Sequence, residues 1–358
     1  MISKNKKRVF VGLSGGVDSA VSALLLKKEG YDVVGVFIKT WHPEFLPCNE
    51  EKERKDAMRI SAHLDIPFLT FDFEKIYKKG VADYMINEYK KGRTPNPDVM
   101  CNKEVKFGAF LREAVKMGAD YVATGHYAQI KKEQNKNNSF QLIKGVDPLK
   151  DQSYFLWTLK QKQLKKVLFP IGALHKTKTR KIAKENLLPV FDKKDSQGIC
   201  FLGDIDLKKF LSHYIKEKKG NVLNTSGEVI GWHRGVSFYT IGERHGFFIT
   251  KKGENKDRLY IIKKDFKKNT ITVSENKENE LKGNSIIDLV NVNLISSNIS
   301  SEKRYFAQIR YHGDYFSCVV KKNSKGIKLV LDKSVLVARG QSCVVYDGNT
   351  CVLGGIVK

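Results

Sequence analysis

The sequence predicts an α/β fold: a parallel sheet with helices on both faces, followed by a small mixed central domain and a C-terminal β-barrel. Short apolar strands alternate with helical segments from residue 9 to residue 124, an order typical of parallel sheets. After residue 204 the chain changes to one helix followed by short strands and glycine turns. Beyond residue 280 evenly spaced strands indicate a small closed barrel. We therefore expect domains at 1–203, 204–279 and 280–358, with a hairpin insertion around 128–156 that packs with the central domain.

Apolar runs and helical periodicity define the individual elements. The strands of the predicted sheet are Val9–Val11, Val33–Ile38, Phe68–Phe71 and Tyr121–Thr124. The predicted helices are Asp18–Glu29, Glu50–Leu64, Tyr77–Lys90, Lys103–Met117, Gln161–Leu168, Thr177–Glu185 and Leu207–Glu217. The predicted barrel strands are Ile286–Val292, Tyr305–Tyr311, Tyr315–Val320, Ile327–Leu331, Ser342–Tyr346 and Val352–Val357. Because ligands of parallel sheets bind at the carboxyl ends of the strands, we expect the segments after the first, second and fourth strands to converge on one crevice.

The chain is strongly basic, with 64 lysines and arginines against 39 aspartates and glutamates and a formal net charge of +25. This excess favours a polyanionic partner such as RNA, DNA or an acidic membrane, although solvated lysine-rich surfaces give the same composition. The N-terminal segment Met1–Arg8 leads into a strand without an apolar signal core, and no apolar stretch is long enough to span a bilayer. We therefore expect a cytoplasmic protein with no membrane partner.

The cysteines separate into two groups. The six are Cys48, Cys101, Cys200, Cys318, Cys343 and Cys351, and none form a Cys-x-x-Cys pair or a zinc-finger spacing with histidine. No metal site is predicted, and a structural disulfide framework is not expected in a cytoplasmic protein. The last three lie in apolar, strand-like runs and are expected to be small core residues. Cys101 and Cys200 lie in polar, turn-like segments and need a chemical explanation.

The segment Gly12–Ser19 follows the first strand and opens the first helix. Glycines allow the backbone to approach a phosphate closely, and a helix N-terminus presents free N–H groups to an anion. The segment contains no lysine, so it is not the phosphate loop that ends in Gly-Lys-Ser/Thr. Its Ser-Gly-Gly-Val-Asp-Ser pattern resembles the pyrophosphate loop of enzymes that split ATP into AMP and pyrophosphate. The sequence therefore predicts a phosphate site here rather than a turn without a ligand.

The segment Arg93–Glu104 combines two prolines, an aspartate and a cysteine. The prolines hold it extended, and Asn102 is a candidate N-cap for the helix that follows. Cys101 would then lie at a helix N-terminus, where the dipole lowers the pKa of a thiol. Asp98 on this stiff loop is placed like a general acid or base. A buried thiol and a turn aspartate explain the same residues equally well.

The segment Lys193–Gly203 places Cys200 near two lysines and a glycine. A nearby positive field favours the thiolate form of a cysteine. Since Ile199 and Phe201 are apolar, a packed and unreactive thiol is the alternative.

A phosphate loop together with two loop cysteines suggests that ATP activates an oxygen as an adenylate and that a sulfur nucleophile displaces AMP. On these residues the chain closely resembles the bacterial tRNA-specific 2-thiouridylases, nearly end to end. The motifs that carry the resemblance are Gly12–Ser19, Pro95–Asp98, Cys101–Phe107, Thr124–Ala128, Lys150–Leu156, Ser196–Phe201, Tyr239–Gly242 and Arg310–Tyr311. Two positions differ from the family pattern, because Glu243 stands where glutamine is expected and Arg339 stands where proline is expected.

The resemblance implies an adenine-nucleotide α-hydrolase-like fold and ATP-dependent 2-thiolation of the wobble uridine of tRNA. Residues that would bind ATP, with Mg²⁺, are Gly12, Leu13, Ser14, Gly15, Gly16, Val17, Asp18, Ser19, Ile38 and Gly125. The C2 oxygen would be adenylated, and a Cys200 persulfide would then transfer sulfur with release of AMP. Cys101 would attack the sulfur linkage and leave a Cys101–Cys200 disulfide, with Asp98 as acid or base.

The same resemblance implies the partners. Asn96, Pro97 and Asp98 would touch the target base, and the other tRNA contacts would be His126, Lys150, Asp151, Gln152, Arg310, Tyr311 and Gln341. The substrates would be the tRNAs that accept lysine, glutamate and glutamine. The sulfur would come from a sulfur-relay protein or a cysteine desulfurase, and no iron–sulfur cluster is expected.

Three other functions fit part of the sequence. Another ATP-pyrophosphatase ligase or amidotransferase would explain the Gly12–Ser19 loop but not the two loop cysteines. A non-catalytic RNA-binding module would explain the net charge of +25 but not the loop. A thiolase with an iron–sulfur cluster would need three clustered cysteine ligands, and Cys48, Cys101 and Cys200 contain no Cys-x-x-Cys pair.

Overall fold

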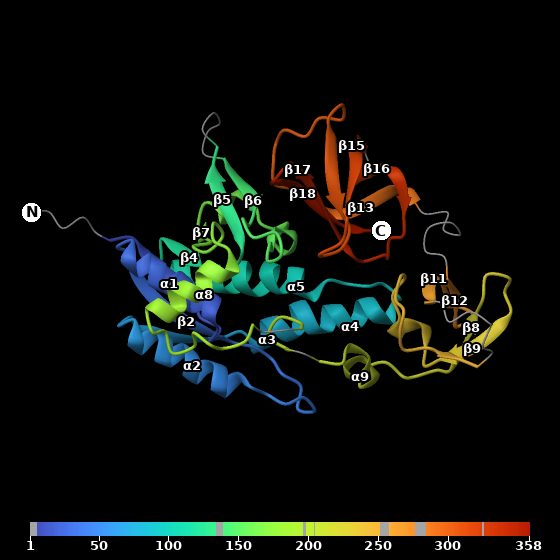
Figure 1. The fold of residues 1–358 in the computed structure, drawn as a ribbon, viewed down its shortest axis with the longest axis horizontal. Helices are drawn as coiled ribbons and strands as arrows, with labels where there is room; N and C mark the ends of the chain where they lie inside the picture. The colour runs from blue at the N-terminus through green and yellow to red at the C-terminus, as the bar shows by residue number, and fades with distance from the viewer. Residues whose placement is uncertain are drawn as a thin grey trace, which may run out of the picture.

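The computed structural model describes residues 6–133, 139–195, 198–203, 205–250, 258–275, 284–323 and 326–358. Ser196 and Gln197 of the predicted Ser196–Phe201 motif lie outside the described residues. In Figure 1 the α/β part (blue to green), the β-barrel (red) and a smaller β-rich part (yellow and orange) lie around the long helical segments of the first part.

The first sheet is fully parallel. Its strands are β1 (Arg8–Gly12), β2 (Asp32–Lys39), β3 (Phe68–Asp72), β4 (Tyr121–Ala123) and β7 (Val167–Leu168), in the order β3-β2-β1-β4-β7. Val9 and Val11 share a core with α1 (Val17–Lys28), α2 (Glu50–His63) and α8 (Lys176–Glu185). Phe10 belongs to a second core with the helical segments that cover the other face. Since adjacent strand residues point to opposite faces, this alternation confirms the predicted two-sided sheet.

The prediction of one helix at Gln161–Leu168 is wrong. Helix α7 covers only Gln161–Leu164, and Val167 and Leu168 form the edge strand β7, which pairs with β4. Strand pairing at the sheet edge satisfies the backbone of these two apolar residues, so tertiary context overrides the helical pattern.

Two long helical segments cover the second face of the sheet. One comprises α3 (Glu74–Tyr77), η1 (Lys78–Ala82) and α4 (Asp83–Lys90), and the other comprises α5 (Pro97–Met100), η2 (Cys101–Phe110) and α6 (Leu111–Lys116). Segments η1 and η2 are π-helical, a geometry that occurs frequently at functional sites.

The second helical segment starts earlier than predicted. Asn96, not Asn102, is the N-cap, because its side chain accepts a hydrogen bond of 3.1 Å from the backbone N–H of Val99. Pro97 takes the first helical position, where its missing N–H costs nothing. Asp98 therefore lies in the first turn of a helix rather than on a loop, and Cys101 lies one turn inside it.

The central domain is a small mixed structure. It contains α9 (Leu207–Ser212), η4 (Val236–Phe238), β8 (Gly220–Leu223), β9 (Val229–His233), β10 (Phe248–Ile249), β11 (Tyr260–Asp265) and β12 (Thr270–Ser274), with strand order β10-β9-β8-β12-β11. Helix α9 is shorter than the predicted Leu207–Glu217.

The C-terminal strands form a closed barrel. They are β13 (Asn284–Leu294), β14 (Arg304–Gln308), β15 (Tyr315–Asn323), β16 (Gly326–Val335), β17 (Ser342–Asp347) and β18 (Thr350–Val357). The barrel closes because β13 pairs with both β16 and β18. Cys318, Cys343 and Cys351 are buried, as predicted.

The hairpin of β5 (Ala128–Lys132) and β6 (Phe140–Lys144) does not pack as expected. Strand β6 pairs with β18, so the hairpin extends the barrel sheet instead of joining the central domain. Backbone pairing with an available barrel strand determines this arrangement, and no local pattern in the hairpin sequence specifies its partner.

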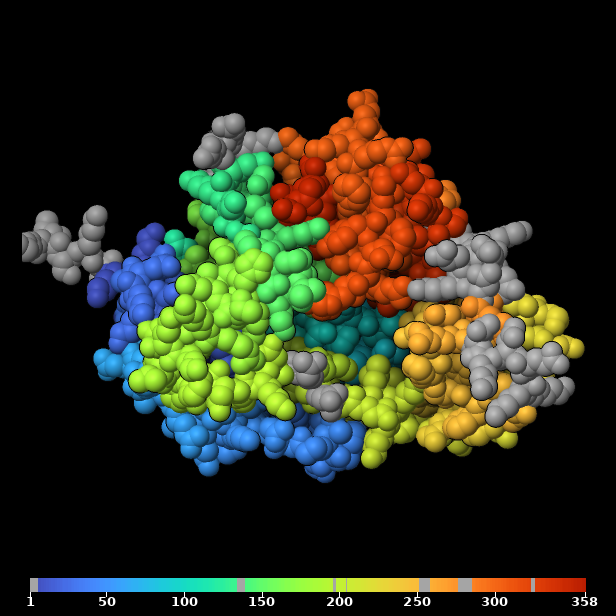
Figure 2. Space-filling model, viewed as in Figure 1, coloured from blue at the N-terminus to red at the C-terminus, as the bar shows by residue number. Residues whose placement is uncertain are grey.

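The segment just before Asn96 is held by both other domains. The backbone N–H of Thr94 donates to the carbonyl of Arg339 at 2.7 Å, and its hydroxyl lies 3.0 Å from that of Thr240. The 3₁₀-helix η3 (Ser153–Leu156) and the residues after it also contact the barrel, where the Tyr154 hydroxyl donates to the carbonyl of Ser342 at 2.7 Å. In Figure 2 the surface is hollowed where the three parts meet, with the teal segment of α5 and η2 at the bottom.

Within the described residues, no helix has the length and apolar character needed to cross a membrane.

The contact between η3 and the barrel yields a stability prediction. Tyr154→Phe leaves the buried carbonyl of Ser342 without its tyrosine donor, so we expect the free energy of unfolding to fall by about 1–2 kcal/mol. Urea denaturation measures this loss. Tyr315→Phe is the control, because the Tyr315 residue is 42% exposed, and an equal loss in both variants would contradict the assignment.

Candidate active site

The predicted phosphate loop lies between β1 and the N-terminus of α1. Gly15 has a φ of +69°, and a Cβ there would lie 2.6 Å from the carbonyl oxygen of Glu53, so only glycine fits without strain. Gly16 is the N-cap residue of α1 and has extended backbone geometry. Ser14 and Ser19 contact each other through their hydroxyls at 3.3 Å. The loop thus presents the N-terminus of a 12-residue helix to an anion.

The segment after β4 packs directly on this loop. A Cβ on Gly125 would lie 2.8 Å from the backbone nitrogen of Ser19, so glycine permits the close approach of the two segments. Ile38 lies at the end of β2, buried in the same core cluster as Cys101. The ends of β1, β2 and β4 thus belong to one side of the parallel sheet, as the convergence prediction requires.

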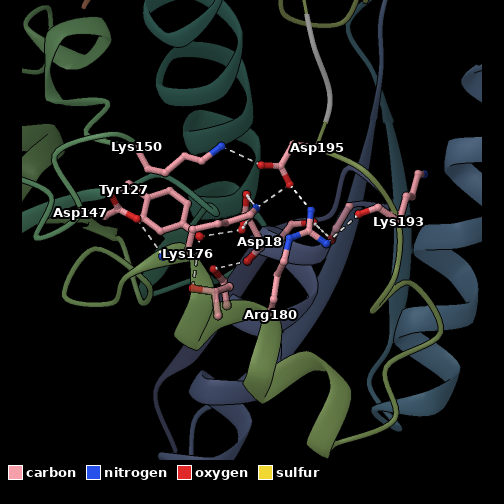
Figure 3. A network of polar contacts seen from close by, with 12 residues as sticks. Asp18, Tyr127, Asp147, Lys150, Lys176, Arg180, Lys193 and Asp195 are labelled. Carbon is pink, nitrogen blue, oxygen red and sulfur yellow. Dashed lines mark hydrogen bonds and ion pairs between the residues drawn. The ribbon is translucent and has the colours of Figure 1, made fainter.

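Asp18, in the first turn of α1, is held by two side chains. The Lys176 ammonium lies 2.7 Å and 2.8 Å from its carboxylate oxygens, and the Tyr127 hydroxyl donates to it at 2.8 Å. Figure 3 shows Lys176 between Asp18 and Asp195. Lys193 donates to the carbonyl of Gly15 at 2.9 Å and to Asp56 at 2.8 Å. Lysines from distant segments therefore surround the phosphate loop.

The two cysteines that are far apart in the sequence meet in the structure. Their sulfur atoms are 3.3 Å apart, with the Cys101 thiol donating to the Cys200 sulfur. Cys101 is buried, whereas Cys200 is partly exposed. Both are free thiols.

Asp98 and Tyr77 hold the Cys200 backbone. The Asp98 carboxylate accepts a hydrogen bond of 2.9 Å from the Cys200 N–H, and the Tyr77 hydroxyl donates to the Cys200 carbonyl at 2.7 Å. Burial raises the pKa of Asp98 above its ordinary value, although the hydrogen bond from Cys200 opposes the shift. A carboxyl group with a raised pKa exchanges protons more readily near neutral pH.

The pKa values of the two thiols are shifted in opposite directions. The hydrogen bond from Cys101 and the positive charge of Lys106 lower the pKa of Cys200 to about 7, against the effect of burial. Burial and the neighbouring Cys200 sulfur raise the pKa of Cys101 well above its ordinary value. The prediction of a lowered pKa at Cys101 is therefore wrong, because the thiol lies inside a buried helix and not at its N-terminus. Cys200 is therefore the thiol of the pair that ionises at lower pH, and Cys101 is the protonated donor.

Sequence reasoning missed the role of Lys106. Burial alone would lower its pKa, but the charges of Cys200, Cys101 and Asp98 raise it above the ordinary value. Its ammonium lies 5.7 Å from the ring centre of Phe201, next to Cys200. In the π-helical segment η2 the backbone bonds join residues five apart, which places Lys106 one turn after Cys101. The spacing of five residues between Cys101 and Lys106 indicates that the two side chains share a face only in a π-helix, which the sequence did not predict.

The residues predicted to contact tRNA at positions 126 and 150–152 form hydrogen bonds with other residues of the protein. His126 is buried between Phe107 and Phe169 and bonds the Thr124 hydroxyl at 2.7 Å, and burial lowers its pKa well below the ordinary value. Asp151 accepts hydrogen bonds from the N–H groups of Gly145 and Ser153. The Gln152 amide oxygen accepts from the Tyr127 N–H at 3.0 Å, and Lys150 binds Asp195 at 2.8 Å. Contacts of these residues with tRNA stay predictions.

Arg310 and Tyr311 lie in the turn after β14, which ends at Gln308, and not in a strand as predicted. The Tyr311 ring packs against Phe155, with ring centres 4.3 Å apart. Gln341 lies in the turn before β17, where its carbonyl accepts from the Val357 N–H.

The two departures from the family pattern have local contacts. Glu243 binds the Lys208 ammonium at 2.5 Å and accepts from the Thr240 N–H at 2.9 Å. The carbonyl of Arg339 accepts the Thr94 hydrogen bond that joins the barrel to the first domain.

The described residues contain no group of three or more His, Cys, Asp or Glu side chains that could hold a metal ion.

Family models match three consecutive parts of the chain. They are described as a tRNA methyl transferase HUP domain at residues 7–204, a tRNA methyl transferase PRC-barrel domain at residues 208–275 and an aminomethyltransferase beta-barrel domain at residues 284–357.

Full-length relatives are similar over nearly the whole chain. The chain is 44% identical to the tRNA-specific 2-thiouridylase MnmA of Geobacillus thermodenitrificans over 99% of this chain and 95% of that protein. Proteins of the same name from Listeria monocytogenes and Bacillus subtilis are 45% and 43% identical, each over 98% of this chain and 94% of theirs. The solved U34-tRNA thiolase NcsA of Methanococcus maripaludis, at 17% identity and a TM-score of 0.35, covers 59% of this chain and 64% of its own and is too distant to add to this. The chain belongs to the tRNA-specific 2-thiouridylase family.

Proposed function

We propose that this chain is a tRNA-uridine 2-sulfurtransferase that thiolates the wobble uridine of tRNA at C2 in an ATP-dependent reaction. The observation that carries the proposal is the pair of sulfur atoms 3.3 Å apart, held by Asp98, on a domain with a phosphate-binding loop. The names of the full-length relatives support the same activity.

The ATP half of the reaction uses the Gly12–Ser19 loop. The N-terminus of α1 binds the phosphates, and the C2 oxygen of uridine attacks the α-phosphorus so that pyrophosphate leaves. Mg²⁺ usually binds through one or two carboxylates together with substrate phosphates, and Asp18 is the carboxylate of this loop. Since Lys176 and Tyr127 already bond Asp18, the phosphates would hold most of the ion, which supplies charge neutralisation on ATP.

The sulfur half uses the two cysteines in unequal roles. Cys200, with the lower pKa and partial exposure, accepts a sulfane sulfur from a donor protein to form a persulfide. Its terminal sulfur attacks C2 of the adenylated base, and AMP leaves with the former C2 oxygen. Cys101 then gives its proton to a base and attacks the inner sulfur of Cys200. The S–S bond breaks, the sulfur stays on the base, and a Cys101–Cys200 disulfide forms that a thiol reductant must reduce.

Asp98 serves two purposes in this scheme. Its carboxylate positions the Cys200 backbone, and its raised pKa suits proton exchange with the base or with Cys101. Asn96 and Pro97 precede it at the start of the helix, where they would touch the target base.

The RNA partner would bind over the recess of Figure 2. A wobble base must leave the anticodon stack to react, and the paired rings of Tyr311 and Phe155 offer a surface for stacking. Arg310 beside them offers a cation for phosphate, in a chain with a net charge of +25. We take the substrates to be the lysine, glutamate and glutamine tRNAs, and the donor to be a sulfur-relay protein or a cysteine desulfurase. The reaction would take place in the cytoplasm.

Separate cysteine variants test the two sulfur steps. Cys200→Ser should not load labelled sulfur from a donor, because it lacks the accepting thiolate. Cys101→Ser should load sulfur on Cys200 but should form no 2-thiouridine, because the persulfide is not resolved. Tryptic mass mapping and nucleoside mass spectrometry measure the two steps. Cys48→Ser, at an exposed free cysteine, is the control and should retain activity. Full activity in either active-site variant would refute the assignment.

The phosphate loop yields a second prediction. Among the described residues, apart from its neighbours in the chain, only the Ser14 hydroxyl lies within 4 Å of a Cβ built on Gly16, at 3.3 Å, so these residues leave room for a side chain there. Gly16→Val should therefore fold but should block the approach of phosphates and reduce ATP binding at least about tenfold. Calorimetric ATP titration and thermal unfolding measure the two properties. Gly15→Ala should instead lower stability as well, because of its positive φ. Normal ATP affinity in Gly16→Val would place the nucleotide elsewhere.

The pKa of Cys200 yields a third prediction. The rate of Cys200 alkylation should rise with pH and reach half its maximum near pH 7, because only the thiolate reacts. Lys106→Met removes the charge that favours the thiolate, so the midpoint should move to higher pH. Mass spectrometry of iodoacetamide-treated protein gives the rates. Lys103→Met, at an exposed lysine of the same segment, should leave the midpoint in place. Identical midpoints in all three proteins would show that Lys106 does not act on Cys200.

A further inference from the structure

Asp195 is surrounded by three cations. Its carboxylate lies 2.8 Å from the ammonium of Lys150, 2.8 Å from that of Lys176 and 2.5 Å from the guanidinium of Arg180. Figure 3 shows these side chains, Lys150 from the turn before η3 and the other two from α8, pointing toward the one carboxylate. An ordinary ion pair needs one cation, so these three cations carry more positive charge than this carboxylate balances.

The cluster adjoins the phosphate loop. Lys176 bridges Asp195 and Asp18, the acidic residue in the first turn of α1. Lys193, which lies just before Asp195 in the sequence, donates to the carbonyl of Gly15 in the loop itself. The cations therefore adjoin the N-terminus of α1, where the phosphates of a nucleotide would bind.

The charge balance leaves the cluster positive. Lys150, Lys176 and Arg180 carry three positive charges, and Asp18 and Asp195 carry two negative ones. The Lys176 residue is only 9% exposed, so water compensates its charge poorly. A phosphate group has more acceptor oxygens than a carboxylate, and arginine binds it through two parallel hydrogen bonds.

We propose that Lys176 and Arg180, with Lys150 at the rim, form a binding subsite for the outer phosphates of ATP, and that Asp195 is an internal anion which those phosphates displace. The inference rests on the proposed function, because it assumes that ATP binds at the Gly12–Ser19 loop. To the proposed ATP site it adds Lys176 and Arg180 of α8 as phosphate-binding residues, and Asp195 as an anion of the chain that competes with phosphate.

The direction in which a substitution of Asp195 changes ATP affinity distinguishes displacement by phosphate from a purely structural role of this residue. Burial opposes the shift, but the hydrogen bonds of Lys150 and Lys176 hold the pKa of Asp195 well below its ordinary range, so the group is an anion at neutral pH. Asp195→Asn removes the competing charge while it keeps the size of the side chain. If Asp195 competes with phosphate, this variant binds ATP more tightly. If Asp195 only orders the cations, the variant binds ATP more weakly.

Calorimetric titration of the full-length chain with ATP, and separately with inorganic pyrophosphate, tests the proposal without any measurement of thiolation. Asp195→Asn should lower both dissociation constants several-fold. Arg180→Met should raise both about tenfold, the cost of a charge-assisted hydrogen bond. Arg180 is the better target, since its side chain is 35% exposed and Lys176 is buried. Lys178→Met, at an exposed residue of the same helix, is the matched control and should change neither constant.

The outcomes separate this inference from the proposed function. Unchanged or weaker binding by Asp195→Asn overturns the internal anion, and unchanged binding by Arg180→Met overturns the subsite. Either result leaves the proposed function in place as long as the unaltered chain binds ATP and Gly16→Val binds it at least about tenfold more weakly. If the unaltered chain binds no ATP, with or without tRNA, both the proposed function and this inference fail.

Discussion

The start of the helix at Asn96 is the constraint on which the active site depends. The Asn96 side chain caps the first turn, and Thr94 just before it is bonded to the barrel and to the central domain. Because both ends of this short segment are held, the first turn of the helix has one position. Asp98 in that turn then holds the Cys200 backbone, and Cys101 one turn later faces the Cys200 sulfur. The barrel and the central domain thus contact the segment that leads into the helix of Asp98 and Cys101.

The segment from Lys193 to Cys200 connects the two halves of the chemistry. At one end Lys193 and Asp195 are bonded to the phosphate loop and to the lysines around it. At the other end Cys200 is bonded to Asp98 and Tyr77. A single stretch of chain thus carries a group beside the proposed nucleotide site and the thiol that we propose receives sulfur. The long sequence distance between the loop and this segment is closed by α8, which precedes the segment and packs against α1.

The difference in pKa between the two thiols follows from their burial and from their neighbours in space, not from the residues next to them in the sequence. Two lysines flank Cys200 in the sequence, but Lys106 of the π-helical segment lowers its pKa. Cys101 has a lysine and a glutamate nearby in the sequence, yet burial keeps it protonated. The hydrogen bond from Cys101 favours the thiolate form of Cys200, so two identical residues acquire different pKa values, as the proposed unequal roles require.

The sequence by itself determined the alternating sheet, the barrel strands and the phosphate loop, because these depend on local periodicity and on glycine at particular turns. It also identified Asp98, Cys101 and Cys200 as candidates, through motifs that resemble a family. Only the tertiary structure decided where the helix after Thr94 begins, that Val167 and Leu168 extend the sheet, and that the hairpin joins the barrel. It alone placed Lys106 beside Cys200 and three cations around Asp195. Periodicity records which face of an element is buried, whereas strand partners, burial depth and charge neighbours arise from residues far apart in the chain.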